Sequence, residues 1–229
     1  MHLLIPAAGR GSRMGSSGNK LLLPLLERNV LAWTLQAADK AESIVWIGII
    51  GQPVDRQAVT DSLERDPITT PVQWIEGGST RQESVSRGLL SLPPEAAHVL
   101  IHDGARCLAT PTLLDLSSAA LIGGTAIITA VPVKDTIKEV DPETHRVQAT
   151  PIRERLWAAQ TPQGFDVGLL KAAHARAREQ AIQVTDDAAL FELLGYPVEV
   201  IPGEETNIKV TTPFDLWLAE AILRSRAGL

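Results

Sequence analysis

The residues with the clearest chemical potential lie within the first twenty positions of the 229-residue chain. Glycines and basic residues follow one another closely there, in the segment PAAGRGSRMGSSGNK of residues 6–20. Glycines let backbone N–H groups approach an anion, and arginine and lysine bring positive charge to the same place. The segment therefore predicts a loop that binds a polyphosphate. A glycine-rich surface turn with solvated basic residues is the alternative.

Two well-known phosphate loops do not fit these letters. A Walker A loop ends in glycine, lysine and then serine or threonine, and neither Gly15 nor Gly18 is followed in that way. In the dinucleotide fingerprint the third glycine would come one residue before Gly15, and an acidic residue would end a second strand, whereas Asp39 closes a helix-like stretch. A nicotinamide dehydrogenase is thus disfavoured.

A second glycine turn follows a predicted strand and leads into a predicted helix. Gly77 and Gly78 expose backbone N–H and C=O groups, and Ser79, Thr80 and Ser84 supply hydroxyls. Such a turn suits a closely packed ribose or pyrimidine. The alternative is that Ser79 or Thr80 only caps the N-terminus of the helix.

A third strand ends in an aspartate, Asp103. A carboxylate at the C-terminal end of a strand, beside a phosphate loop, is a typical Mg²⁺ ligand, and a simple turn former is the alternative. The neighbouring Cys107 is the only cysteine, so no intrachain disulfide forms, and no activating group is evident beside it. The five histidines have no spacing typical of a zinc site.

The elements that must position these residues alternate along the chain. We expect strands at 2–6, 43–50, 72–75, 97–102, 124–131 and 196–201, and helices at 30–40, 56–64, 81–90, 113–120, 167–180, 186–194 and 214–224. Thr185 is a predicted N-cap for the helix at 186–194, and Thr212-Pro213 starts the last one. Buried strands without polar alternation indicate one α/β domain over residues 1–229, a Rossmann-like three-layer sandwich with a mostly parallel central sheet.

One segment departs from this alternation. Residues 132–140 alternate apolar and polar side chains, a turn follows at Asp141-Pro142, and extended polarity resumes at 145–151. The pattern predicts a projecting β-arm over about residues 133–152. An isolated ribbon is marginal in water, so a second copy of the chain is the expected partner, with a flexible surface hairpin as the alternative.

The overall charge limits the possible partners. With 21 basic and 27 acidic residues the net charge is −6, so the field of the whole protein attracts neither nucleic acid nor an anionic membrane. No signal peptide or apolar run of about 18 residues is present, and the cytoplasm is the expected compartment.

The segment at residues 6–20 resembles the signature of the sugar-phosphate nucleotidyltransferases, and within that superfamily the chain is similar to the 2-C-methyl-D-erythritol 4-phosphate cytidylyltransferase family. Five motifs stand in family order: PAAGRGSRM with Lys20, GGSTRQES (77–84), HDGAR (102–106), RERLWAAQTPQ (153–163) and NIKVTTP (207–213). The resemblance implies transfer of CMP from CTP to 2-C-methyl-D-erythritol 4-phosphate, with Mg²⁺. It also implies a homodimer formed through the arm.

The resemblance further implies roles for individual residues. Arg13 and Lys20 would be catalytic and Asp103 would bind the metal. The implied nucleotide ligands are Ala7, Ala8, Gly9, Gly11, Ser12, Gly77, Gly78, Arg81 and Ser84. The implied acceptor ligands are Asp103, Arg106, Thr136, Arg153, Thr161 and Lys209.

Two positions depart from the family pattern. Cys107 replaces a proline that would fix φ, and Ser12 stands where some members carry a second arginine. Ribitol-5-phosphate cytidylyltransferases share several of the motifs and remain an alternative. A non-catalytic nucleotide-binding module is another, although it would need neither Lys20 nor Asp103.

Overall fold

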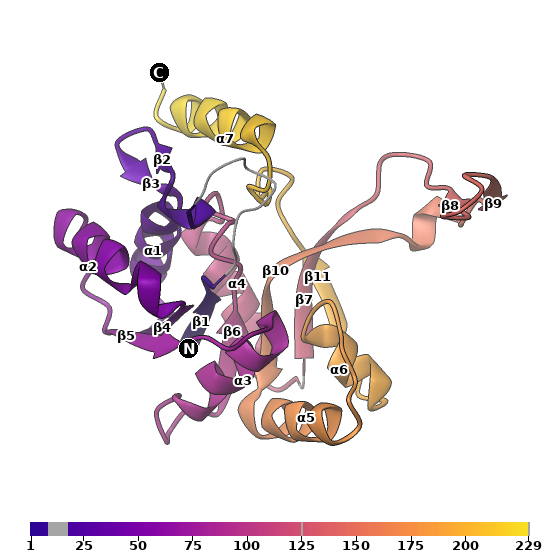
Figure 1. The fold of residues 1–229 in the computed structure, drawn as a ribbon, viewed down its shortest axis with the longest axis horizontal. Coiled ribbons are helices and arrows are strands. Elements are labelled where there is room, and N and C mark those ends of the chain that lie inside the picture. Colours follow the sequence, from indigo (N-terminus) through magenta and orange to yellow (C-terminus); the bar gives the residue numbers. More distant parts are fainter. Residues whose placement is uncertain (9–17, 125, 229) are drawn as a thin grey trace.

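A mixed β-sheet with helices on both faces forms the body of the protein (Figure 1). The computed structural model describes residues 1–8, 18–124 and 126–228. Within them the seven-stranded sheet has the order β11-β7-β10-β6-β1-β4-β5. Its strands are β1 (His2–Pro6), β4 (Trp46–Gly51), β5 (Val72–Glu76), β6 (His98–Ile101), β7 (Ala126–Pro132), β10 (Trp157–Asp166) and β11 (Glu199–Pro202).

Strand β1 lies in the interior of the sheet and pairs in parallel with β4 and β6, so that His2 lies opposite both Trp46 and Val99. Leu3, Leu4 and Ile5 are fully buried because helices cover both faces. Side chains alternate across the strand, so Leu3 and Ile5 belong to one core cluster and Leu4 to the other.

The two helical layers follow from these two clusters. One cluster takes in side chains of α1 (Val30–Lys40), α2 (Arg56–Arg65), α4 (Pro111–Leu121) and α7 (Pro213–Arg226). The other takes in α3 (Arg81–Leu90), α5 (Val167–Glu179) and α6 (Ala188–Leu193). The predicted three-layer α/β fold with a mostly parallel sheet is confirmed.

The reversed strand β10 is the main feature that the sequence patterns did not predict. It lies between β6 and β7 and is antiparallel to both. Pro162 and Gly164 argue against a central strand, because proline cannot donate to the ladder and glycine adds no packing. The chain accommodates Pro162 at an irregularity in the pairing with β7, where the register shifts between Ala159 and Gln163.

Helix starts were predicted well where one side chain caps the backbone. Thr80 accepts a hydrogen bond from the N–H of Glu83 at the start of α3, and Thr212 forms a capping box with Asp215 at the start of α7. The predicted cap at Thr185 is wrong. Helix α6 begins at Ala188 after Asp187, whose side chain makes no capping bond.

The segment between β7 and β10 extends away from the sheet as an arm (Figure 1). Its tip pairs β8 (Glu139–Val140) with β9 (Val147–Ala149), and a short 3₁₀ helix η4 (Arg153–Arg155) leads back towards β10. Only these few residues pair, so the ribbon is shorter than its alternating pattern suggests. A second small hairpin pairs β2 (Pro24–Leu25) with β3 (Arg28–Asn29).

Two further short 3₁₀ helices complete the described elements, η2 (Lys20–Leu22) and η3 (Pro53–Asp55). Among the residues that the structure describes, none of the helices has both the length and the apolar character needed to cross a membrane.

Gly88 tests how closely α3 packs on the sheet. An added Cβ would lie 2.5 Å from Ile50 Cδ1 and 3.1 Å from Leu4 Cδ1, both in the buried core. Helix propensity alone favours alanine over glycine by about 1 kcal/mol, whereas overpacking costs about 1–3 kcal/mol. We expect Gly88→Ala to lower the free energy of unfolding, measured by urea titration.

Gly168→Ala in α5 is the matched control, because its Cβ would meet only Asp166 Oδ1, at 3.3 Å. This variant should stay within about 0.5 kcal/mol of the original protein. A more stable Gly88→Ala protein would show that α3 is not in close contact with β1 and β4.

Candidate active site

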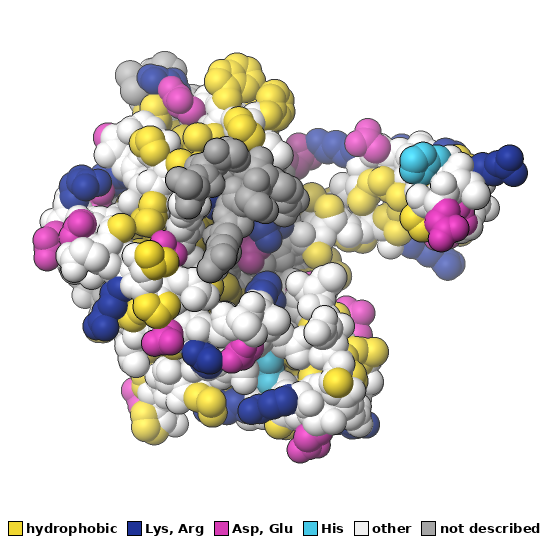
Figure 2. Space-filling view, in the orientation of Figure 1, with side chains coloured by type: hydrophobic (Ala, Val, Ile, Leu, Met, Phe, Trp, Pro, Cys, Tyr) yellow, Lys and Arg dark blue, Asp and Glu magenta, His cyan; other side chains and the backbone are white. Residues whose placement is uncertain are grey.

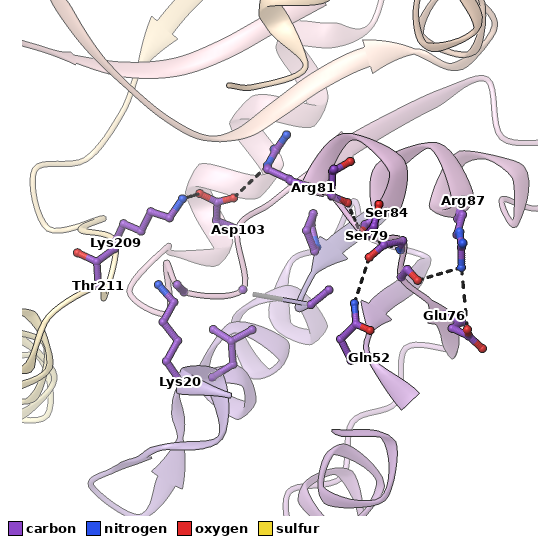
Figure 3. Close-up of a pocket in the computed structure, with 18 residues that line it drawn as sticks. Lys20, Gln52, Glu76, Ser79, Arg81, Ser84, Arg87, Asp103, Lys209 and Thr211 are labelled. Atoms are coloured by element: carbon purple, nitrogen blue, oxygen red, sulfur yellow. Dashed lines mark hydrogen bonds and ion pairs between the residues drawn. The ribbon is translucent and has the colours of Figure 1, made fainter. Parts of the chain in front are cut away.

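A cavity of about 890 Å³ opens where the central parallel strands end (Figure 3). In open α/β sheets, ligands bind outside the carboxyl ends of the strands. The described residues that line the cavity lie at or just after the ends of β1, β4, β5 and β6, in α3 and the turn before it, in η2, and in the segment before α7. They are Pro6, Ala8, Lys20, Leu21, Gln52, Glu76, Gly77, Gly78, Ser79, Thr80, Arg81, Ser84, Arg87, Asp103, Gly104, Ala105, Lys209 and Thr211.

Asp103 is surrounded by cations. Its carboxylate lies 2.7 Å from Lys209 Nζ and 4.0 Å from Arg81 Nε (Figure 3). It also lies 3.8 Å from Arg106 Nε. Burial acts to raise the pKa of Asp103, but the charge and hydrogen bond of Lys209 and the charges of the two arginines outweigh it, so the pKa is lowered. Arg81 also pairs with Asp187, so three cations face two carboxylates and an excess of one positive charge remains, which suits an anionic ligand.

Lys20 is brought to the same cavity by Asn19. The Asn19 amide donates to Ala7 O at 2.7 Å and to Asp55 Oδ2 at 2.9 Å, while its oxygen accepts from the N–H of Leu21. This side chain therefore fixes the start of η2 against the end of β1. Lys20 Nζ donates to Val210 O at 2.7 Å, which ties it to the segment that carries Lys209.

The second glycine turn both caps α3 and lines the cavity. Gly77 N–H donates to Gly51 O at 2.8 Å, and Gly78 N–H donates to Ser84 Oγ at 3.0 Å. The Ser84 hydroxyl in turn donates to Thr80 O. A Cβ on Gly78 would lie 2.4 Å from the Glu83 side chain, so glycine is required for this close approach.

Glu83 holds the outer side of that turn. It accepts hydrogen bonds from the hydroxyl and the N–H of Ser79, each at 2.7 Å. These bonds, helped by Arg87, lower the pKa of Glu83 to about 2. Thr80 rather than Ser79 is the N-cap of α3, and both residues line the cavity.

Arg81 is oriented by a buried pair that the sequence analysis missed. Its Nη1 lies 2.7 Å from Asp187 Oδ2, and Asp187 Oδ1 lies 3.2 Å from His174 Nε2. Burial acts to raise the pKa of Asp187, but the hydrogen bond from His174 and the charge of Arg81 outweigh it and lower the pKa. The sequence analysis placed Asp187 only within the helix expected at 186–194 and gave it no partner.

His102 and Thr161 lie behind Asp103. Thr161 Oγ1 accepts from the N–H of Asp103 at 2.9 Å and lies 3.0 Å from His102 Nδ1, whose ring is 1% exposed. Burial lowers the pKa of His102 to about 4. Arg106 is held by the carbonyl oxygens of Asn207, at 2.7 Å, and Ala159, at 3.3 Å.

The structure brings many of the predicted site residues together, though not all. Ala8, Lys20, Gly77, Gly78, Arg81, Ser84, Asp103 and Lys209 line the cavity. Ala7 is buried beside it, and Arg106 and Thr161 contact Asp103 from behind. Thr136 and Arg153 are exposed on the arm. Gly9, Gly11, Ser12 and Arg13 lie outside the described residues.

Few side chains are available to bind the predicted metal ion. Among residues 1–8, 18–124 and 126–228 no group of three or more histidine, cysteine, aspartate or glutamate side chains could hold an ion. Mg²⁺ usually keeps several waters and takes one or two carboxylates plus substrate phosphates. Asp103 therefore fits as one ligand in the presence of a bound polyphosphate.

Cys107 behaves as a core residue. Its side chain is 3% exposed, and burial raises the pKa of the thiol to about 12. A thiol of that pKa stays protonated at neutral pH, which agrees with the prediction that it is inert.

Fold and cavity together define a class: an α/β protein that binds a phosphorylated ligand at the carboxyl edge of its sheet. Comparison with known proteins is more specific. The family model of 2-C-methyl-D-erythritol 4-phosphate cytidylyltransferase matches residues 1–225. The chain therefore belongs to this family.

Similar sequences and solved structures support the same family. The enzyme of that name from Gloeobacter violaceus is 65% identical over 99% of this chain and 97% of its own length. The one from Synechococcus elongatus is 62% identical with the same coverage. The crystal structure of 4-diphosphocytidyl-2C-methyl-D-erythritol synthase from Anaerococcus prevotii has a TM-score of 0.86 and 34% identity, covering 97% of this chain and 95% of that one.

The buried Arg81–Asp187 pair gives a test of stability against pH. Asp187 is 1% exposed, and removing one partner of a buried pair costs about 3 kcal/mol, so Asp187→Asn should lower the free energy of unfolding by about that amount at neutral pH. The folded pKa of Asp187 is lowered. Its contribution is therefore present above the unfolded pKa of about 4 and is lost as the pH falls through the lower folded value.

The difference between the original protein and Asp187→Asn should accordingly shrink below about pH 4, measured by urea titration at several pH values. Asp61→Asn, at an exposed position on α2, is the control and should change little. A difference that stays constant down to pH 3 would contradict the ionised pair.

Proposed function

We propose that this chain transfers CMP from CTP to 2-C-methyl-D-erythritol 4-phosphate, which gives 4-diphosphocytidyl-2-C-methyl-D-erythritol and pyrophosphate for isoprenoid precursor synthesis. Family membership over residues 1–225 supports the reaction. The structural observation that carries it is the excess of positive charge around Asp103, beside a glycine turn that leaves room for a nucleoside. Ribitol 5-phosphate as the acceptor is not favoured.

The chemistry needs positioning more than proton transfer. A phosphate oxygen of the acceptor attacks the α-phosphorus of CTP, a new P–O bond forms, and the bond to the β-phosphate breaks with release of pyrophosphate. The second pKa of a phosphate monoester is about 6, so the attacking oxygen is already ionised at neutral pH. No general base is required. The protein must instead hold both reactants and stabilise charge on the α-phosphate.

Lys20 is the described residue best placed for that stabilisation, because it lines the cavity and its position is fixed by η2. Arg13 is proposed to act with it. Gly77, Gly78, Arg81 and Ser84 are proposed to hold the nucleoside half of CTP, together with Ala7, Ala8, Gly9, Gly11 and Ser12. When bound, Mg²⁺ would neutralise phosphate charge, and Asp103 is the residue that would hold it.

The acceptor is proposed to lie on the Lys209 side of the cavity. Lys209 is 43% exposed along its side chain and pairs with Asp103, so its ammonium group can be shared with an incoming phosphate. Arg106 and Thr161 support the same side from within the protein. Thr136 and Arg153 would have to come from elsewhere, because the arm that carries them points away from the sheet (Figure 1).

A homodimer would supply these two residues. The arm exposes Ile137, Val140, Val147 and Ile152, each at least 40% accessible, and hydrophobic side chains lie among charged ones on it (Figure 2). A ribbon with so few paired residues is marginally stable unless something covers it. We propose that a second copy does so, and that its arm reaches the acceptor end of the cavity.

CTP is a cytoplasmic metabolite, and we propose the cytoplasm as the compartment.

The reaction is tested by measuring pyrophosphate release with a panel of nucleoside triphosphates and acceptor phosphates. Release should need CTP, 2-C-methyl-D-erythritol 4-phosphate and Mg²⁺ together. Lys20→Ala should lower kcat by about 10²-fold or more, the scale for losing one preorganised stabilising group, with a smaller effect on CTP affinity. Lys40→Ala, at the exposed end of α1, should match the original protein. Equal turnover of ribitol 5-phosphate would contradict the assigned acceptor.

Subunit sharing is tested by mixing two inactive variants. Arg153→Ala and Lys20→Ala homodimers should each be nearly inactive. After unfolding, equal mixing and refolding, about half of the dimers are mixed, and one site in each combines both original residues while the other carries both changes. Activity should return to about a quarter of the original value. If mass spectrometry confirms mixed dimers and no activity returns, Arg153 and Lys20 serve one site from a single chain.

A further inference from the structure

A chain of hydrogen bonds holds the turn that presents Asp103 to the cavity. The N–H of Asp103 donates to Thr161 Oγ1 at 2.9 Å, and Thr161 Oγ1 lies 3.0 Å from His102 Nδ1. His102 Nε2 lies 3.2 Å from Arg106 O. The N–H of Arg106 donates back to Asp103 O at 2.9 Å, so the bonds close a ring around residues 102–106.

The direction of the bonds follows from their partners. A backbone carbonyl can only accept, so His102 Nε2 must carry a proton to bond Arg106 O. A neutral imidazole then has a bare Nδ1, which accepts from the Thr161 hydroxyl. The remaining lone pair of Thr161 Oγ1 receives the N–H of Asp103. With these directions, every polar atom that takes part in the closed ring of hydrogen bonds has a partner.

Neither side chain reaches the cavity. His102 is 1% exposed and Thr161 is 4% exposed, and neither is among the described residues that line it. With Nδ1 of His102 bare, the Thr161 hydroxyl donates to His102 and also accepts from the N–H of Asp103. The ring therefore acts on the site through Asp103, whose carboxylate pairs with Lys209.

We propose that His102 and Thr161 are positioning residues for the cytidylyl transfer, with the proton of His102 on Nε2. Together they fix the peptide of Asp103 and so the orientation of the carboxylate among Lys209, Arg106 and Arg81. The inference deepens the proposed function and depends on it. It gives Thr161 a role through Asp103 in place of direct contact with the acceptor.

The proton position is tested without any activity measurement. Long-range ¹H–¹⁵N correlation spectra of histidine-labelled protein near pH 7 report the tautomer of each of the five imidazoles. The signal of His102 is assigned by its loss in His102→Asn. The Nε2–H tautomer is expected, and Thr161→Val should perturb this signal more than the other four. The Nδ1–H tautomer would overturn the proposal.

The positioning role is tested by a double-mutant cycle. His102→Leu and Thr161→Val should each lower kcat/KM for the acceptor by about 10-fold, because each leaves a buried partner unsatisfied. If both act through one chain of bonds, the double variant should be no worse than the worse single one. If the two residues act independently, as they would if Thr161 contacted the acceptor directly, the double variant should lose about 100-fold in kcat/KM. That result would overturn the proposal.

His98→Leu, at the start of the strand that His102 follows, is the matched control. No hydrogen bond among residues 102, 103, 106 and 161 involves His98, so this variant should leave these kinetics unchanged. His102→Asn, which keeps an acceptor facing Thr161, should recover part of the loss seen in His102→Leu and remains usable if the leucine variant does not fold. Unchanged acceptor kinetics in a folded His102→Asn and Thr161→Val would also overturn the role.

A wild-type protein without transfer activity would overturn the proposed function, while the tautomer spectra would still show whether the ring of hydrogen bonds exists.

Discussion

The charge of the cavity depends on one largely buried carboxylate, that of Asp103. Lys209, Arg106 and Arg81 come from three different segments and would repel one another if they converged on an apolar pocket. Asp103 offsets that repulsion, and their charges keep its pKa low despite burial. The same carboxylate would repel the phosphates of a nucleotide. This conflict is the physical reason to expect a divalent cation between Asp103 and the phosphates once substrate is bound.

Asp103 in turn depends on backbone contacts between segments that are far apart in the sequence. The N–H of Val210 donates to Ala105 O, and Lys20 donates to Val210 O. The buried amide of Asn207 donates to Thr161 O at 2.8 Å. The segment before α7, the turn after β6 and the irregular part of β10 are thereby joined. The reversed strand β10 is what places Thr161 behind the turn, so the antiparallel insertion serves the site as well as the sheet.

These links explain what could be predicted from the sequence and what could not. The bounds of α1 and α3 were predicted correctly because apolar periodicity and capping residues act within a few positions. Strand β10 was not predicted from the sequence, because proline and glycine are unfavourable inside a strand. Only its pairing with β6 and β7 shows that Pro162 and Gly164 lie within one. Motif matching singled out Lys20, Asp103 and Lys209, and all three line the cavity. It gave no role to Asp187 or His102, because their function is to hold another side chain or a peptide through contacts distant in sequence.

The distribution of charge also bears on how an anionic substrate reaches the cavity. The net charge of −6 gives the whole molecule a field that opposes a nucleotide, whereas the cations near Asp103 act over short distances. At physiological ionic strength the screening length is about 8 Å, so the opposing field is weak beyond the surface and the local cluster dominates near the opening. Association would then gain little from long-range steering. Binding would rest on contacts made inside the cavity, where Lys20, Lys209 and the turn at Gly77 and Gly78 are already held in place by the protein's own hydrogen bonds.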